Sequence, residues 1–114
     1  MDFRNLENSI EFSDDQLIKR IIFSNEQILS FVLNLKRGQT LPVHEHENSS
    51  VVLNVLQGKG ELQINDKVQK LQKGSAALAN GKDKFGIPLV EENLSLFVTI
   101  SPRPNDKKFA QEIG

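Results

Sequence analysis

The two histidines of the chain, His44 and His46, stand two residues apart, and there are no others. Residues i and i+2 of a β-strand point to the same face, so a strand here would project both imidazoles together. Imidazole is the commonest metal ligand in proteins and titrates near neutral pH. If that face is enclosed, the pair could hold a divalent metal (zinc, nickel, copper, iron or manganese) or act as a general base. The alternative is a solvent-facing pair in a charged loop, because Glu45, Glu47 and Asn48 surround it.

A metal centre would need more than these two side chains. Catalytic zinc and facial iron sites usually take three protein ligands. Glu47 is the candidate third ligand, since it follows at the strand end, where the alternation can fail. The parity of Glu45 on the strand turns it away from the pair. With two histidines as the candidate ligands and Glu47 as a possible third, we expect any metal to be weakly held.

The context of the pair carries a family resemblance. Gly38 precedes His44 by six positions, and a strand-like run that reaches Gly58 follows the pair. This pattern resembles the first motif of small single-domain cupins (cupin type-2, RmlC-like). The stretch Gln72–Gly81 resembles the opening of the second cupin motif in a degenerate form. The resemblance extends over about residues 17–101, most of the chain.

The resemblance also implies a metal site that this sequence fills incompletely. The family site resembles three histidines plus one Glu or Gln. Ser50 and Val51 stand where the Glu or Gln is expected, and Phe85 stands at the third histidine. Two of the four ligands are therefore missing. The resemblance places a ligand pocket around His44 and His46, walled by Val51 and Phe85.

Short apolar segments separated by turn residues predict the elements that position these groups. Nine strands are expected: Leu17–Phe23, Ile28–Leu35, Leu41–His46, Val51–Leu56, Gly60–Ile64, Lys67–Leu71, Ala76–Ala79, Phe85–Pro88 and Leu94–Ser101. Short helices are expected only at the ends, each covering a barrel mouth or an edge strand. Strands without helical crossovers indicate an all-β fold. With the resemblance, this predicts one cupin-like double-stranded β-helix (a jelly-roll barrel) over residues 1–114, with its core at about 17–101.

The composition limits the classes of partner that the chain is expected to bind. The 114 residues carry a net charge of −1 and no cluster of Lys and Arg, so nucleic acid is not expected. Cysteine is absent, which excludes disulfides and thiolate metal sites. No apolar run is long enough for a membrane span, and no signal peptide is visible at the N-terminus, so we expect a cytoplasmic protein without a membrane partner. Edge strands of small barrels often pair with a second copy, so we expect a homodimer.

Four functions remain open from the sequence. The first is a small-molecule binding cupin, with or without a loosely held metal. The second is a metal-dependent enzyme such as a dioxygenase or isomerase. The third is metal-free acid–base catalysis by His44 or His46. The fourth is a non-catalytic structural or regulatory homodimer. The missing ligands favour the first, and the sequence identifies neither a substrate nor a catalytic residue.

Overall fold

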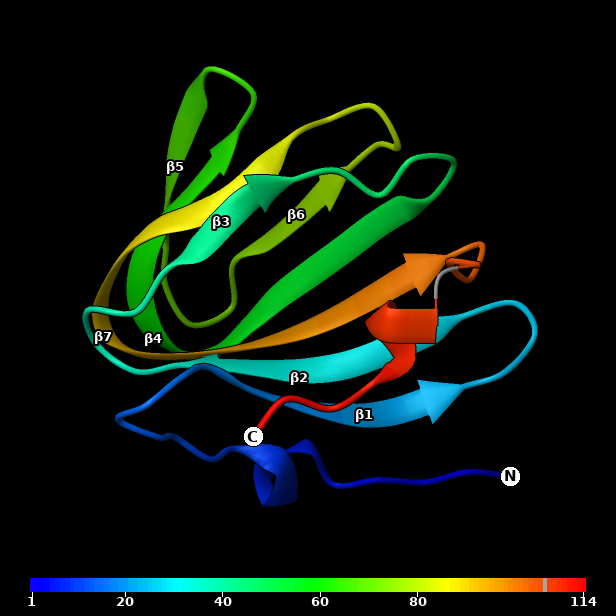
Figure 1. Cartoon of the computed structure of the whole chain (residues 1–114). Helices are drawn as coiled ribbons and strands as arrows, with labels where there is room; N and C mark the ends of the chain where they lie inside the picture. Colours follow the sequence, from blue (N-terminus) through cyan, green and yellow to red (C-terminus); the bar gives the residue numbers. More distant parts are fainter. Residues whose placement is uncertain (106) are drawn as a thin grey trace.

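The computed structural model describes residues 1–105 and 107–114, and within these ranges seven strands form one antiparallel sheet that folds over on itself (Figure 1). The strands are β1 (Ile18–Ser24), β2 (Leu29–Leu35), β3 (Leu41–His44), β4 (Ser50–Ile64), β5 (Lys67–Leu71), β6 (Ala76–Ala79) and β7 (Phe85–Ser101). None of the described helices is long and apolar enough to cross a membrane.

The two long strands, β4 and β7, hold the fold together. They pair with each other from Ser50 opposite Ser101 to Ile64 opposite Phe85. β2 pairs with the second half of β7 and β1 pairs with β2, whereas β3 pairs with the first half of β7. β6 and β5 pair with the two halves of β4. In Figure 1, β1 and β2 therefore form one layer, β3, β5 and β6 lie in the other, and β4 and β7 run through both. This is the all-β arrangement that the sequence predicts.

Both long strands differ from the sequence prediction, which divides each of them into two. The segments predicted as Val51–Leu56 and Gly60–Ile64 are the two halves of β4, and β7 is likewise continuous. The register between β4 and β7 shifts several times between Val55 and Gln63, so the strands bend without ending. Gly58 lies at this bend with φ +92°, and a Cβ there would stand 2.1 Å from the backbone oxygen of Asn93. A glycine is thus needed for the close approach, and it does not end the strand.

The prediction of short helices at the two ends of the chain is wrong. The described residues form two four-residue 3₁₀ turns instead, η1 (Leu6–Ser9) and η2 (Lys107–Ala110). After η2 the chain pairs with the sheet edge: Lys19 donates its backbone N–H to the Ile113 carbonyl at 2.9 Å, and Ile113 donates back at 3.1 Å. These bonds take the backbone groups that a C-terminal helix would have used.

The core lies between the two layers. It is made of buried aliphatic and aromatic side chains from β2, β4 and β7, with smaller contributions from β5 and β6. β2 is buried on both of its faces. One face packs in the core, and the opposite face, which includes Asn34, is covered by the N-terminal segment. Asn34 donates to the Ser9 carbonyl at 2.9 Å and accepts from the Ser95 hydroxyl at 2.6 Å. The cavity described next opens within this interior.

Candidate functional site

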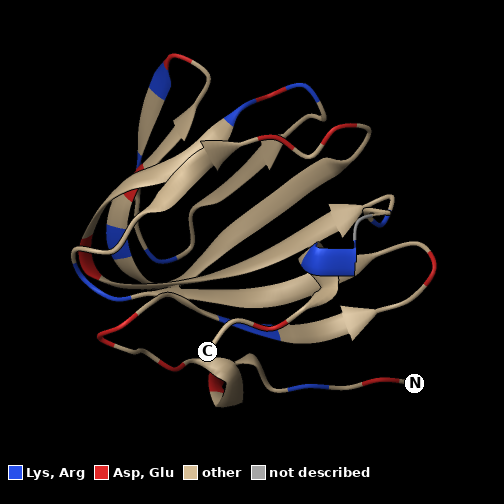
Figure 2. Ribbon diagram, viewed as in Figure 1, with Lys and Arg blue, Asp and Glu red and all other residues tan. Residues whose placement is uncertain are grey.

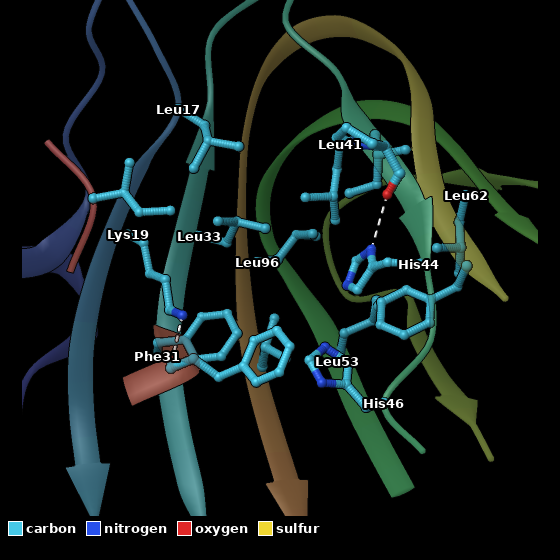
Figure 3. A pocket seen from close by; sticks show the side chains of 16 residues that line it. Leu17, Lys19, Phe31, Leu33, Leu41, His44, His46, Leu53, Leu62 and Leu96 are labelled. Atoms are coloured by element: carbon cyan, nitrogen blue, oxygen red, sulfur yellow. Dashed lines mark hydrogen bonds between the residues drawn. The ribbon is translucent and has the colours of Figure 1, made fainter. Parts of the chain in front are cut away.

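A cavity of about 300 Å³ lies between the layers, with the C-terminal segment beside it (Figure 3). Its walls come from β1, β2, β3, β4 and β7, together with η2 and the segment after it. Sixteen described residues line it, and thirteen of them are apolar: Leu17, Phe31, Leu33, Leu41, Pro42, Leu53, Leu62, Phe85, Ile87, Leu96, Val98, Phe109 and Ile113. The other three are Lys19, His44 and His46, so each titratable group among them is basic.

His44 ends β3 and turns its ring into the cavity. Its Nδ1 lies 2.8 Å from the carbonyl oxygen of Pro42. A carbonyl can only accept, so Nδ1 carries the proton and donates, which leaves the Nε2 lone pair available. The ring packs against Phe85 with a centroid separation of 4.5 Å. The local backbone thus fixes the tautomer of His44 and leaves one acceptor for a ligand.

His46 lies just beyond β3, in a turn where its carbonyl accepts from the Ser49 N–H at 3.0 Å. Its ring centroid is 5.0 Å from that of His44, with an edge-on arrangement, and 4.6 Å from that of Phe109. The side chain is only 8% exposed, and its buried Nδ1 has no hydrogen-bond partner among the described residues. Burial, helped by the charges of His44 and Lys19, lowers the pKa of His46 to about 4. The ring is therefore neutral at pH 7.

Lys19 lies on β1, across the cavity from the two histidines (Figure 3). It is only 6% exposed. Its ammonium donates to the carbonyl oxygen of Phe109 and stands 4.4 Å from the centre of the Phe31 ring. Burial lowers the pKa of Lys19 below the usual lysine value. Within residues 1–105 and 107–114, no ion pair includes it.

Sequence reasoning missed Lys19, although a signal was present. The strand alternation places Lys19 on the same face as Leu17 and Ile21. Both of those residues pack against the core, so the face is the inner one. A charged residue in a strand is normally taken to point outward. Phe109 lies in the C-terminal segment, for which the sequence predicts only a short helix over a barrel mouth or an edge strand, and its contact with His46 has no sequence signal.

The residues singled out from the sequence are only partly brought together. His44, His46 and Phe85 line the cavity. Val51 does not line it, contrary to the expectation. It is buried on the inner face near the start of β4, where it belongs to the apolar core, and Leu53, two residues further on, reaches the cavity instead. Glu47 is exposed in the turn after His46.

The residues present do not fit an evolved metal centre of the kind that the family resemblance implies. Across the described part of the chain, no group of three His, Cys, Asp or Glu side chains is arranged to hold a metal ion. Phe85, at the position of the third histidine, packs its ring against both imidazoles, at 4.5 Å from His44 and 5.8 Å from His46. A phenyl ring supplies no ligand, and two histidines fall short of the usual three.

Comparison with solved structures identifies the fold. TT1209 from Thermus thermophilus matches with a TM-score of 0.84 and 27% identity over 91% of this chain and 100% of that one. An RmlC-like cupin protein from Desulfovibrio desulfuricans matches with a TM-score of 0.82 and 27% identity, covering 90% and 98% of the two chains. KdgF from Halomonas sp. matches with a TM-score of 0.78 and 22% identity, covering 93% and 98%. Neither a protein-family model nor a curated protein sequence matches. The chain is a cupin-fold protein whose structural neighbours are RmlC-like and other small cupins.

Proposed function

We propose that this cupin-fold chain binds a small, mainly apolar molecule in the cavity between its two layers, without needing a metal. The supporting observation is the cavity itself: about 300 Å³, apolar on thirteen of sixteen lining residues. Ligand pockets are typically of roughly 300–1,000 Å³, mostly apolar, with a few polar groups that orient the ligand. Lys19, His44 and His46 are those groups here. The volume sets a limit on the ligand, which must be compact.

The two histidines are suited to orientation. His44 presents a free Nε2 acceptor, because its Nδ1 is engaged by the Pro42 carbonyl. His46 is held neutral and keeps an unpartnered buried Nδ1. A buried polar group without a partner costs free energy of about 1–3 kcal/mol. A loosely bound divalent ion on these rings is not required by this proposal, and the homodimer expected from the sequence stays a prediction that sedimentation at two concentrations would check.

Thermal unfolding with a panel of small apolar compounds tests the proposal. A compound that binds the folded state raises the melting temperature in a concentration-dependent way. We expect this rise to persist in excess chelator. It should be lost in Leu96→Phe, which extends a ring into the cavity, and kept in the matched variant Leu78→Phe, whose position on β6 is exposed. The melting curve of each variant without compound shows whether it folds.

The contrary result is equally definite. One tightly held zinc, nickel, copper, iron or manganese ion per chain, lost in His44→Ala, would mean that a metal centre exists. Stabilisation that vanishes in chelator would point the same way. Either result would favour the metal-dependent enzyme over the metal-free binder.

A further inference from the structure

We infer that the ligand of this cavity carries a carboxylate, which pairs with the ammonium of Lys19 while its apolar body fills the space beside the histidines. This inference rests on the proposed function and names the chemical class of its ligand. It follows from the charge of Lys19 inside the cavity, which lacks an acidic counterpart among the described residues.

Among the described residues, the cavity is lined by basic groups and by no acidic ones. Lys19, His44 and His46 are its titratable lining residues, and none of the other described lining residues is Asp or Glu. Figure 2 shows that the Asp and Glu residues stand mostly in loops and near the chain ends. Burying an ammonium costs free energy unless it is paired. An incoming carboxylate supplies the missing charge.

Lys19 also has donors to spare. An ammonium has three N–H bonds, and one is used by the Phe109 carbonyl. The Phe31 ring offers its face at 4.4 Å, a weaker partner than an anion. Arg20, the next residue along β1, forms ion pairs with Glu11 and Glu112 at the surface, so acids are within reach of this strand on its outer side. The inner side is left for a ligand.

Phe109 ties the two polar sides of the cavity together. Its carbonyl accepts from Lys19, and its ring lies 4.6 Å from that of His46. The charge of Lys19 is one of the causes that lower the pKa of His46, after burial and His44. A carboxylate beside Lys19 is thus near a neutral imidazole whose Nδ1 has no partner in the described chain. The remaining lining is apolar, which suits a hydrocarbon body.

Matched probes test the charge. We would titrate the protein by calorimetry, in excess chelator, with octanoate, octanamide and octylamine, and with 3-phenylpropanoate and its amide. Each set shares one apolar body and differs in the head group. Hydrogen bonds to charged groups contribute enough that each acid should bind about tenfold or more tightly than its amide. Octylamine should be the weakest, because its charge repels Lys19. Chelator prevents the acids from binding through a metal.

Two lysine variants locate the effect. In Lys19→Met the acid should lose its preference over the amide, while the affinity for the amide stays within about twofold. Lys70→Met, at an exposed position of β5, should keep the full preference. Since a buried pair is poorly screened, the preference should also survive about 0.5 M salt, at about the strength seen in low salt.

The outcomes separate this inference from the proposed function. Equal binding of acids and amides to the natural protein would overturn the carboxylate and leave the small-molecule binder intact. An acid preference that persists in Lys19→Met, or disappears in Lys70→Met, would also overturn the assignment to Lys19. Binding of none of the probes by either body would count against both.

Discussion

The two sides of the cavity handle charge in opposite ways. On the β3 side, His44 is bonded to a carbonyl of its own strand, and His46 is held neutral. On the β1 side, Lys19 keeps a buried ammonium supported by the Phe109 carbonyl and the Phe31 ring. The histidine side carries the family resemblance, whereas the lysine side carries the charge. A ligand entering between them meets polarity at both ends but attraction for an anion at only one.

The largest expected difference between the two sides is in the free energy of unfolding that is lost when an aromatic ring is removed. Phe85→Ala should lower the free energy of unfolding by about 3–5 kcal/mol, because this 4% exposed ring packs against both histidines. Phe109→Ala should cost about half as much, since Phe109 is only partly buried and lies in a short 3₁₀ turn. Urea unfolding of both variants measures the difference. Equal losses would mean that the C-terminal segment belongs to the core as firmly as β7 does.

The next largest effect is expected on the histidine side at low pH, through protonation of His46. Its pKa is about 4 in the folded protein and near 6.5 when unfolded, so the unfolded state binds the proton first. The contribution of neutral His46 to the free energy of unfolding is therefore fully present above pH 6.5. It is lost as the pH falls from 6.5 to 4, by about 3 kcal/mol at most. In His46→Phe the free energy of unfolding should not fall by this amount over the same pH range. Unfolding of both proteins at several pH values isolates it, and an NMR titration midpoint of His46 near 6.5 would contradict the account.

The smallest effect is expected from Lys19. Lys19→Met removes an ammonium that lacks a described acidic partner, at the cost of one hydrogen bond to Phe109. We expect the free energy of unfolding at pH 7 to rise by about 1 kcal/mol. Because the pKa of Lys19 is lowered in the folded state, this gain should shrink as the pH rises through the usual lysine value near 10.4. Urea unfolding at about pH 7 and pH 10.5 checks it.

Lys70→Met is the matched control for that measurement. Its side chain is exposed on β5, so the substitution should change stability by about 0.5 kcal/mol or less. A loss of stability in Lys19→Met, with no change in Lys70→Met, would show that the ammonium is already well compensated. The case for a carboxylate ligand would then weaken.

The local sequence pattern predicted most of the strands, because the position of a strand follows from the alternation of apolar residues and from the turn residues that bound it. The turn at Asn65, with φ 54°, lies between β4 and β5 as its residue type indicates. The continuity of β4 through Gly58 could not be predicted from local signals. Whether a glycine ends a strand or permits a close crossing depends on what lies opposite, here Asn93. The terminal helices failed for a similar reason, since the partner of Ile113 is Lys19, far away in sequence.

The site was predictable only where its residues are rare and closely spaced. His44 and His46 stand out as the two histidines of the chain, and both line the cavity. Val51 was chosen by its position in a motif, and its burial in the core shows that a motif position does not fix which inward residue reaches the cavity. Alternation pairs Lys19 with Leu17 and Ile21, but it does not say which face is the inner one, because Ile18 on the opposite face is apolar and buried as well. The role of the Phe109 carbonyl could not be predicted, because backbone groups leave no trace in residue type.

The most direct test of the metal-free binding cavity is an NMR titration with octanoate in excess chelator. The account predicts saturable changes in the Lys19 side-chain and His46 ring signals, with the signals of Lys70 unchanged. Changes confined to exposed residues, or none at the cavity residues, would contradict it.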